Sequence, residues 1–158
     1  MTTSCKPALH TRRLLVLTGI AALFLATGSS AQEQLHITAT ISGAARVVDG
    51  DTAVVASKVV RLKGVDAAEL GTPRGENARR MMITLVTREL TCRLTGEKTW
   101  RREVGYCVTT DGVDINQAII ASGAALACPR YDDRYMRYEQ ADALAAQARA
   151  VYCEKGAR

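Results

Sequence analysis

Three runs of strand-forming residues constrain the fold of this chain more than any other feature. Residues 35–48, 52–56 and 59–65 are rich in Val, Ile, Leu and Thr, which favour extended structure. The Asp49–Gly50 pair between the first two runs is typical of a tight hairpin turn, and a short link near Ser57 separates the second run from the third. The sequence therefore predicts three consecutive strands within residues 35–65.

Apolar residues at helical spacing predict three helices after these strands. The first helix is expected at 74–88, where four apolar residues recur at positions i, i+3, i+4 and i+7: Ala78, Met81, Met82 and Leu85. The second opens at the capping sequence DINQ, residues 114–117, and should end at Gly123. The last is expected at about 133–150, with one stripe made of Ala141, Leu144, Ala145, Ala148 and Val151.

Two more strands are expected at about 90–95 and 102–109, which brings the predicted elements to five strands and three helices. The first helix follows the third or fourth strand along the chain. This order suits a small closed barrel with helices packed on it. The predicted fold class is therefore α+β, mainly β, with a five-stranded barrel and about three helices.

Residues 1–31 have the pattern of an export signal. Lys6, Arg12 and Arg13 precede the apolar run LLVLTGIAALFLA, which is too short for a comfortable membrane span, and Ser29 and Ala31 mark a cleavage site. The alternative is an uncleaved N-terminal anchor. Cleavage leaves residues 32–158 as one domain with 18 basic and 16 acidic residues, a net charge of +2. That charge alone is too small to indicate a nucleic-acid partner.

Four cysteines remain after the predicted cleavage site, and an even number in an exported chain indicates disulfides. Cys92 and Cys107 are equally distant from the Thr99–Trp100 midpoint, so they face each other if that segment is a hairpin. Cys128–Cys153 then follows by elimination. The alternative is four free thiols. A zinc ribbon and a thioredoxin-type site are excluded, because the chain has no CxxC pair.

Three acidic residues lie at predicted strand ends. A buried charge without a partner is energetically costly, so these acids are candidates for a functional site. Asp51 begins one strand, and Asp66 and Glu69 follow the end of the next, so a barrel can bring them together. Two carboxylates and a backbone carbonyl make a site suited to a hard cation such as Ca²⁺. Asp49 is interpreted as the turn-forming residue beside them. The spacing of acidic residues excludes an EF-hand.

Two arginines could bind an anion beside these acids. Arg61 lies in the strand that leads to Asp66, and Arg102 opens a later strand. The guanidinium group binds two phosphate oxygens and stays charged, although each residue alone could be an ordinary surface arginine. His36 is the one histidine after residue 31 and is expected in a strand, so Ser-His-Asp catalysis and histidine-metal nuclease sites are excluded.

Four segments together, VVDGDT, RLKGVDAAE, RREVGYC and DGVDINQAIIASGAA, resemble the staphylococcal nuclease (thermonuclease) family in order, over about residues 44–150. The resemblance implies an OB-fold barrel with three helices that cleaves DNA and RNA with Ca²⁺. It implies that Asp51, Asp66 and the Ala67 carbonyl hold the metal. By the same resemblance, Glu69 is the general base, and Arg61 and Arg102 hold the phosphate.

The chain also departs from the family pattern. Ala68 stands where the family usually has proline, which should loosen the turn that aims Glu69, and the loop after Glu69 is shorter than in the staphylococcal enzyme. Trp100 replaces a tyrosine, Arg101 a glycine and Pro129 an aromatic residue. Trp100 is expected to stack on a base, or else to be an exposed hairpin residue. Tyr131 matches a second family tyrosine near the nucleotide, and its alternative is core packing.

The sequence therefore predicts an exported calcium-dependent nuclease, periplasmic or secreted, with DNA and RNA as substrates. It is expected to be a monomer without stable membrane association after signal cleavage. The resemblance implies cleavage of the 5′ P–O bond, which leaves 3′-phosphates. One alternative is a non-catalytic OB-fold module that binds nucleic acid in the periplasm. Another is a disulfide-bonded structural domain of the same compartment.

Overall fold

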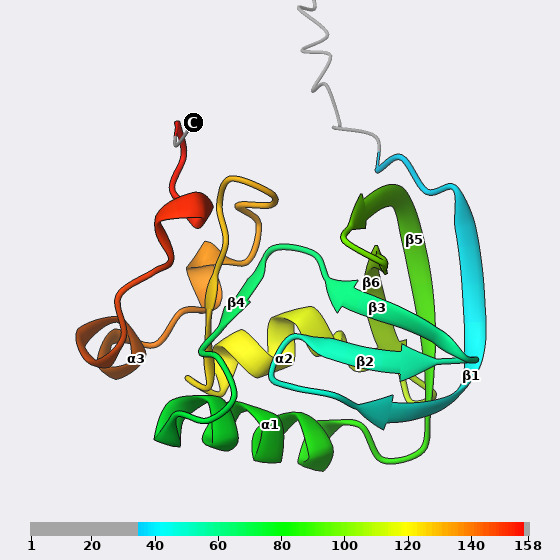
Figure 1. Cartoon of the computed structure of the whole chain (residues 1–158), viewed down its shortest axis with the longest axis horizontal. Coiled ribbons are helices and arrows are strands. Elements are labelled where there is room, and N and C mark those ends of the chain that lie inside the picture. Colours follow the sequence, from blue (N-terminus) through cyan, green and yellow to red (C-terminus); the bar gives the residue numbers. More distant parts are fainter. Residues whose placement is uncertain (1–34, 157–158) are drawn as a thin grey trace, which may run out of the picture. The chain divides into compact units, whose positions relative to one another are not determined.

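The computed structural model describes residues 35–156, and five strands of this part close into a barrel in the order β1-β2-β3-β6-β5 (Figure 1). All neighbouring strands are antiparallel except β3 and β6, which pair in parallel. The strands are β1 (Ala39–Val47), β2 (Thr52–Val55), β3 (Lys58–Leu62), β5 (Glu89–Thr99) and β6 (Arg102–Thr109). The predicted mainly β barrel is confirmed. The predicted export signal, residues 1–31, lies outside the described residues.

Alternating apolar residues fill the barrel, as expected for strands with one buried face. Val55, Val60, Leu62 and Leu90 are each at most 1% exposed. Two glycines, Gly50 between β1 and β2 and Gly64 shortly after β3, have no space for a side chain. A Cβ on Gly50 would lie 2.5 Å from the Ala78 Cβ, and Gly64 has φ of +72°. Both turns therefore depend on glycine. Having no Cβ, glycine tolerates a positive φ and lets the backbone lie close to neighbouring segments of the chain.

A second, two-stranded sheet was not predicted from the sequence. It pairs β4 (Val65–Ala67) with β7 (Ala125–Ala127), and Asp66 lies opposite Leu126. The third predicted strand, 59–65, is therefore two strands, separated by a turn at Gly64 that turns the chain out of the barrel. As a result Asp66 lies within a strand and not at the end of one. His36 also differs from expectation, because it is exposed and precedes β1.

The first two helices lie close to their predicted positions. Helix α1 (Pro73–Leu85) begins after Thr72, whose hydroxyl accepts a hydrogen bond from the Gly75 N–H. Helix α2 (Ile115–Ala121) begins after Asp114, whose carboxylate accepts from the Gln117 N–H, and Gly123 follows with φ of +74°. Helix α1 packs on α2 and β1, and α2 packs on β6 and β7.

The predicted third helix is present, but its predicted extent of 133–150 was wrong. Only α3 (Ala141–Ala146) is α-helical there, between single 3₁₀ turns at Met136–Tyr138 and Val151–Cys153. The predicted stripe is not the buried face, since Leu144 is 45% and Val151 74% exposed while Ala143 is buried. Glu139 accepts a hydrogen bond from the Ala127 N–H and pairs with Arg149. These contacts anchor Glu139 and Arg149 beside β7, and the residues around them are extended rather than helical.

Both predicted disulfides are present. Cys92 and Cys107 are register partners on β5 and β6, and their side chains form the first disulfide. Cys128 follows β7 and forms the second with Cys153. All four residues are at most 1% exposed. Two buried disulfides indicate an extracytoplasmic protein, because reducing compartments disfavour them. Among residues 35–156, each helix is too short or too polar to cross a membrane.

Removing the barrel disulfide should lower stability without changing the fold. The Cys92→Ala/Cys107→Ala variant loses a crosslink between residues 15 apart, which limits the entropy of the unfolded chain. The chain-entropy model gives about 3 kcal/mol for a loop of this size. Denaturant unfolding of the variant and the parent, both with Cys128–Cys153 intact, measures the difference. Equal free energies of unfolding would contradict the expectation.

Candidate active site

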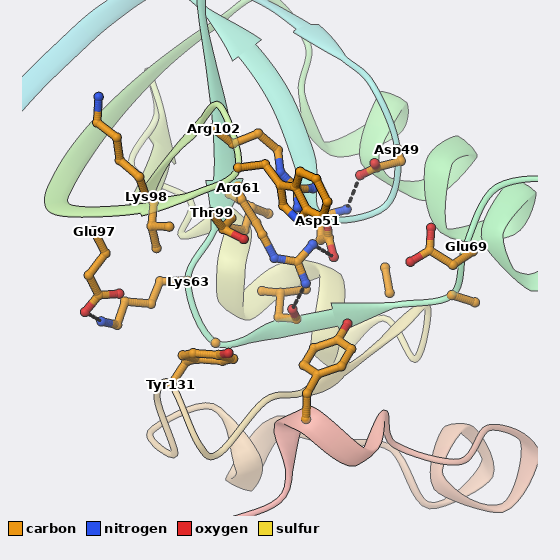
Figure 2. A pocket seen from close by; sticks show the side chains of 18 of the residues that line it. Asp49, Asp51, Arg61, Lys63, Glu69, Glu97, Lys98, Thr99, Arg102 and Tyr131 are labelled. Atoms are coloured by element: carbon orange, nitrogen blue, oxygen red, sulfur yellow. Dashed lines mark hydrogen bonds and ion pairs between the residues drawn. The ribbon is translucent and has the colours of Figure 1, made fainter. Parts of the chain in front are cut away.

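A pocket of about 510 Å³ opens between β4 and the tip of the β5–β6 hairpin (Figure 2). It brings together seven of the eight residues that the sequence singled out for a site, the exception being Asp66. These seven lining residues are Asp51, Arg61, Ala67, Glu69, Trp100, Arg102 and Tyr131. The fold thus places residues from three strands, β3, β4 and β6, and from four connecting segments around one cavity, of a size that suits a small ligand.

Asp51 is the most deeply buried acid on the pocket wall, with 5% of its surface exposed. Its Oδ2 lies 2.6 Å from the Arg61 Nη1, and its Oδ1 accepts a hydrogen bond from the Thr52 hydroxyl at 2.8 Å. Burial raises the pKa of Asp51 to about 6, although the Arg61 charge opposes this effect. A carboxylate in this position would gain from a second positive charge.

The DGD sequence positions Asp51 through a tight turn. The Asp49 Oδ1 accepts a hydrogen bond from the Asp51 N–H at 3.0 Å, which confirms Asp49 as the turn-forming residue. A Cβ on Gly50 would lie only 2.7 Å from the Ala67 Cβ. Glycine at this position therefore lets the turn that carries Asp51 lie directly against Ala67, one of the predicted metal-binding positions.

Asp66 does not line the pocket, although its neighbours Val65 and Ala67 do. It is 3% exposed, and both carboxylate oxygens accept hydrogen bonds from a distant part of the chain. Oδ2 accepts from the Ala150 N–H at 2.8 Å, and Oδ1 accepts from the Tyr152 hydroxyl at 3.4 Å. Burial raises the pKa of Asp66, and the two hydrogen bonds act against this rise.

The two predicted arginines converge on the same corner of the pocket. Arg61, on β3, donates from Nη2 to the Val65 carbonyl at 3.4 Å in addition to its ion pair with Asp51. Arg102, at the start of β6, donates from Nη1 to the Thr52 hydroxyl at 3.3 Å. Both side chains are partly buried. Two positive charges therefore lie beside Asp51, as an anion-binding site requires.

Glu69 is exposed on the pocket wall, and its carboxylate is turned toward the pocket in Figure 2. Among residues 35–156 its side chain has no hydrogen-bond or ion-pair partner. Its backbone is held firmly despite Ala68, because the Glu69 carbonyl accepts a hydrogen bond from the Thr72 hydroxyl at 2.8 Å. A Cβ on Gly75 would lie 2.0 Å from that carbonyl oxygen, so the start of α1 packs directly on this turn.

The two aromatic residues that the sequence singled out both line the pocket. Trp100, at the tip of the β5–β6 hairpin, is 93% exposed and has φ of +58°. Trp100 is therefore an exposed hairpin residue, as one of the two expectations had it, and it also lines the pocket. Tyr131 is 49% exposed, so the core-packing alternative for it is wrong. The Arg130 guanidinium lies 5.9 Å from the centre of its ring. Both aromatic faces are accessible for stacking.

Among the pocket residues that the sequence interpretation did not single out are Lys63 and Tyr152. Lys63, next to Gly64, forms an ion pair with Glu97 at 2.5 Å at one edge of the pocket, as Figure 2 shows. Tyr152 lines the pocket and reaches Asp66. Tyr152 could have been found, because it adjoins Cys153, which the predicted disulfide brings to the loop after β7. Lys63 has no comparable signal in the sequence.

The residues present fit a hard cation in the kind of ligand atoms they offer. Asp51, Asp66 and the Ala67 carbonyl supply only oxygen, which Ca²⁺ prefers. Burial raises the pKa of Asp51, so a bound cation would stabilise the charged form of this carboxylate. Within residues 35–156, however, no three His, Cys, Asp or Glu side chains gather as a metal cluster. The protein would therefore supply few ligands, and substrate or water would have to complete the coordination.

Comparison with known proteins gives two matches. Residues 59–152 match the family described as Staphylococcal nuclease homologue. The chain is also similar to the succinoglycan biosynthesis protein ExoI of Rhizobium meliloti (strain 1021), with 34% identity over 119 residues. The match covers 68% of this chain and 59% of that protein, so the chain spans less than two thirds of its relative's length.

Proposed function

Because this chain belongs to the staphylococcal nuclease homologue family, we propose that it is a calcium-dependent nuclease that hydrolyses phosphodiester bonds of DNA and RNA. One observation carries the proposal. A single pocket holds a buried acid, Asp51, two arginines beside it, and a free carboxylate, Glu69, on its wall. This combination offers charge for a phosphate and a base for water.

The reaction follows from what these side chains can do. Glu69 accepts a proton from a water molecule, which then attacks phosphorus in line with the leaving oxygen. Arg61 and Arg102 donate hydrogen bonds to phosphate oxygens and offset the negative charge that grows on them. Ca²⁺, when bound by Asp51, Asp66 and the Ala67 carbonyl, would supply further positive charge at the same phosphate. The family resemblance implies 5′ P–O cleavage, with 3′-phosphate products.

Substrate binding would use the aromatic residues at the edge of the pocket. Trp100 and Tyr131 present exposed ring faces on which bases can stack, and stacking does not depend on the sugar. This supports the proposal that both DNA and RNA are substrates. We also propose that residues 1–31 direct export to the periplasm or the medium, and that the cleaved protein is a monomer without stable membrane association.

A second function, a non-catalytic OB-fold module that binds nucleic acid, is favoured by one observation. The Asp66 carboxylate faces Ala150 and Tyr152 rather than the pocket. A site that had lost its metal would keep the arginines and aromatic residues, and so would keep binding. The relative from Rhizobium meliloti is named for succinoglycan biosynthesis, which adds no support to either function.

The test is digestion of plasmid DNA and RNA by the cleaved protein, with Ca²⁺ and with chelator. We expect cleavage with Ca²⁺ only, and Asp51→Asn should weaken Ca²⁺ affinity and activity together, because it removes a charged oxygen ligand. Asp49→Asn is the matched control, since Asn can still accept the hydrogen bond from the Asp51 N–H. Binding of nucleic acid without cleavage would favour the non-catalytic module. Unchanged calcium dependence in Asp51→Asn would refute the metal assignment.

A further inference from the structure

The short segment of residues 149–153, here called the anchoring segment, donates a hydrogen bond to each carboxylate oxygen of Asp66. Its Ala150 N–H and Tyr152 hydroxyl donate to the two Asp66 oxygens at 2.8 and 3.4 Å. Tyr152 is 46% exposed and lines the pocket, whereas Asp66 behind it is 3% exposed. The anchoring segment therefore determines where the Asp66 carboxylate points.

The anchoring segment is held at both ends. At one end the Arg149 Nη2 lies 2.6 Å and 2.8 Å from the two Glu139 oxygens, and its Nε donates to the Ala127 carbonyl at 2.9 Å. At the other end the Cys153 carbonyl accepts from the Arg130 N–H at 3.0 Å. The Cys128–Cys153 disulfide adds a covalent link at that end.

The disulfide connects the anchoring segment to the sheet that carries Asp66. Cys128 directly follows β7, which pairs with β4, and the Cys128 N–H donates to the Gly64 carbonyl at 2.8 Å. Apart from one 3₁₀ turn, the anchoring segment has no regular structure, and Val151 within it is 74% exposed. Its position depends on a few hydrogen bonds and on the disulfide.

Hydrogen-bond donors to a metal-binding carboxylate affect how well it binds the metal. Each carboxylate oxygen can accept more than one bond, so a hydrogen bond leaves capacity for a cation. Partners that hydrogen-bond to a metal-binding carboxylate fix its direction, and their loss typically costs about 10–100-fold in metal affinity. Ala150 and Tyr152 are placed to act in this way on Asp66.

We propose that the anchoring segment completes the cation site by orienting Asp66, and that the Cys128–Cys153 disulfide keeps it in place. This inference rests on the proposed function, because it concerns the cation that the proposed nuclease uses. It assigns to Ala150 and Tyr152 the role of positioning the Asp66 carboxylate. It also assigns the two disulfides different tasks, since Cys92–Cys107 links barrel strands β5 and β6 and does not contact Asp66.

The test compares the two disulfides by calorimetric titration of the cleaved protein with Ca²⁺. Cys128→Ala/Cys153→Ala should bind Ca²⁺ about 10–100-fold more weakly than the parent. Cys92→Ala/Cys107→Ala, the matched control, should keep the parent affinity. Amide hydrogen exchange at Ala150 gives a second readout, with exchange expected to be slow in the parent and fast only in the first variant.

Tyr152→Phe keeps the inference testable if the first variant does not fold. It removes only the hydroxyl on Asp66 and should weaken Ca²⁺ binding severalfold, whereas Tyr138→Phe, with a hydroxyl that has no partner in the described residues, should not. Equal affinity in all variants would overturn the inference and leave the nuclease proposal standing. Tighter binding without the disulfide would also overturn it, since the segment would then block Asp66. If the parent protein binds Ca²⁺ but cleaves no nucleic acid, the proposed nuclease activity is wrong and the inference about the anchoring segment still stands.

Discussion

Glu69→Gln should slow calcium-dependent cleavage by about 10²–10⁴-fold, the range typical of losing a general base. Glutamine keeps the length and shape of the side chain but cannot accept a proton from water at neutral pH. Glu69 is exposed, and within residues 35–156 its carboxylate has no partner, so the substitution breaks no contact that stabilises the fold. The rate constant for cleavage at saturating substrate is the quantity to measure, with Ca²⁺ affinity determined separately and expected to stay the same.

Glu97→Gln is the matched control for Glu69, because both acids line the same pocket. Glu97 pairs with Lys63 at 2.5 Å and has no assigned part in the chemistry, so its loss should have a small effect on the rate. If Glu69→Gln cleaves as fast as the parent protein, the general base is another group. A large effect of Glu97→Gln alone would place the reaction at the Lys63 side of the pocket.

Arg102→Ala should cost at least as much as a single transition-state donor usually does, about 10²–10³-fold in kcat. Arg102 makes one long hydrogen bond, 3.3 Å to the Thr52 hydroxyl, so its removal should affect the fold little. An arginine that serves the transition state more than the bound substrate lowers kcat when it is lost, with little change in KM. Steady-state kinetics on a short oligonucleotide separate the two parameters.

The neighbouring Arg101→Ala is the control for Arg102. Arg101 is exposed in the two-residue turn between β5 and β6 and carries the same charge. Its loss should reduce only the general attraction for nucleic acid. Arg102 would have no catalytic part if its substitution raised KM alone, or if both variants lost the same small factor.

Local signals in the sequence were sufficient to predict the barrel. The Asp49–Gly50 turn and the alternation of β-branched residues depend on neighbours a few positions apart, and each gave a strand or turn close to its observed place. The Cys92–Cys107 disulfide was predictable for a related reason. Both cysteines lie on the strands of one hairpin, 15 residues apart. The turn itself is at Trp100–Arg101, and an irregularity between Leu94 and Lys98 shifts the register so that Cys92 lies directly opposite Cys107.

Features that depend on distant partners were not predictable in this way. The third helix had a helical pattern over 133–150, but the contacts of Glu139 and Arg149 with β7 override that local preference. Within residues 35–156, three non-glycine residues have positive φ, namely Ala56, Ser57 and Trp100, and no turn-forming sequence predicted this. The direction of the Asp66 side chain was missed because its partners, Ala150 and Tyr152, are 84 and 86 residues away.

The two acids of the proposed cation site differ greatly in how far along the chain their contact partners lie. Asp51 meets Arg61 within one hairpin, a contact between residues only ten positions apart. Asp66 meets Ala150 across 84 residues, and contacts at such separations form slowly because the chain loses more entropy in closing the loop. A folding chain that has formed the barrel therefore holds Asp51 while Asp66 is still without its partners. Catalytic competence would then arrive with the final step of folding, well after the barrel itself.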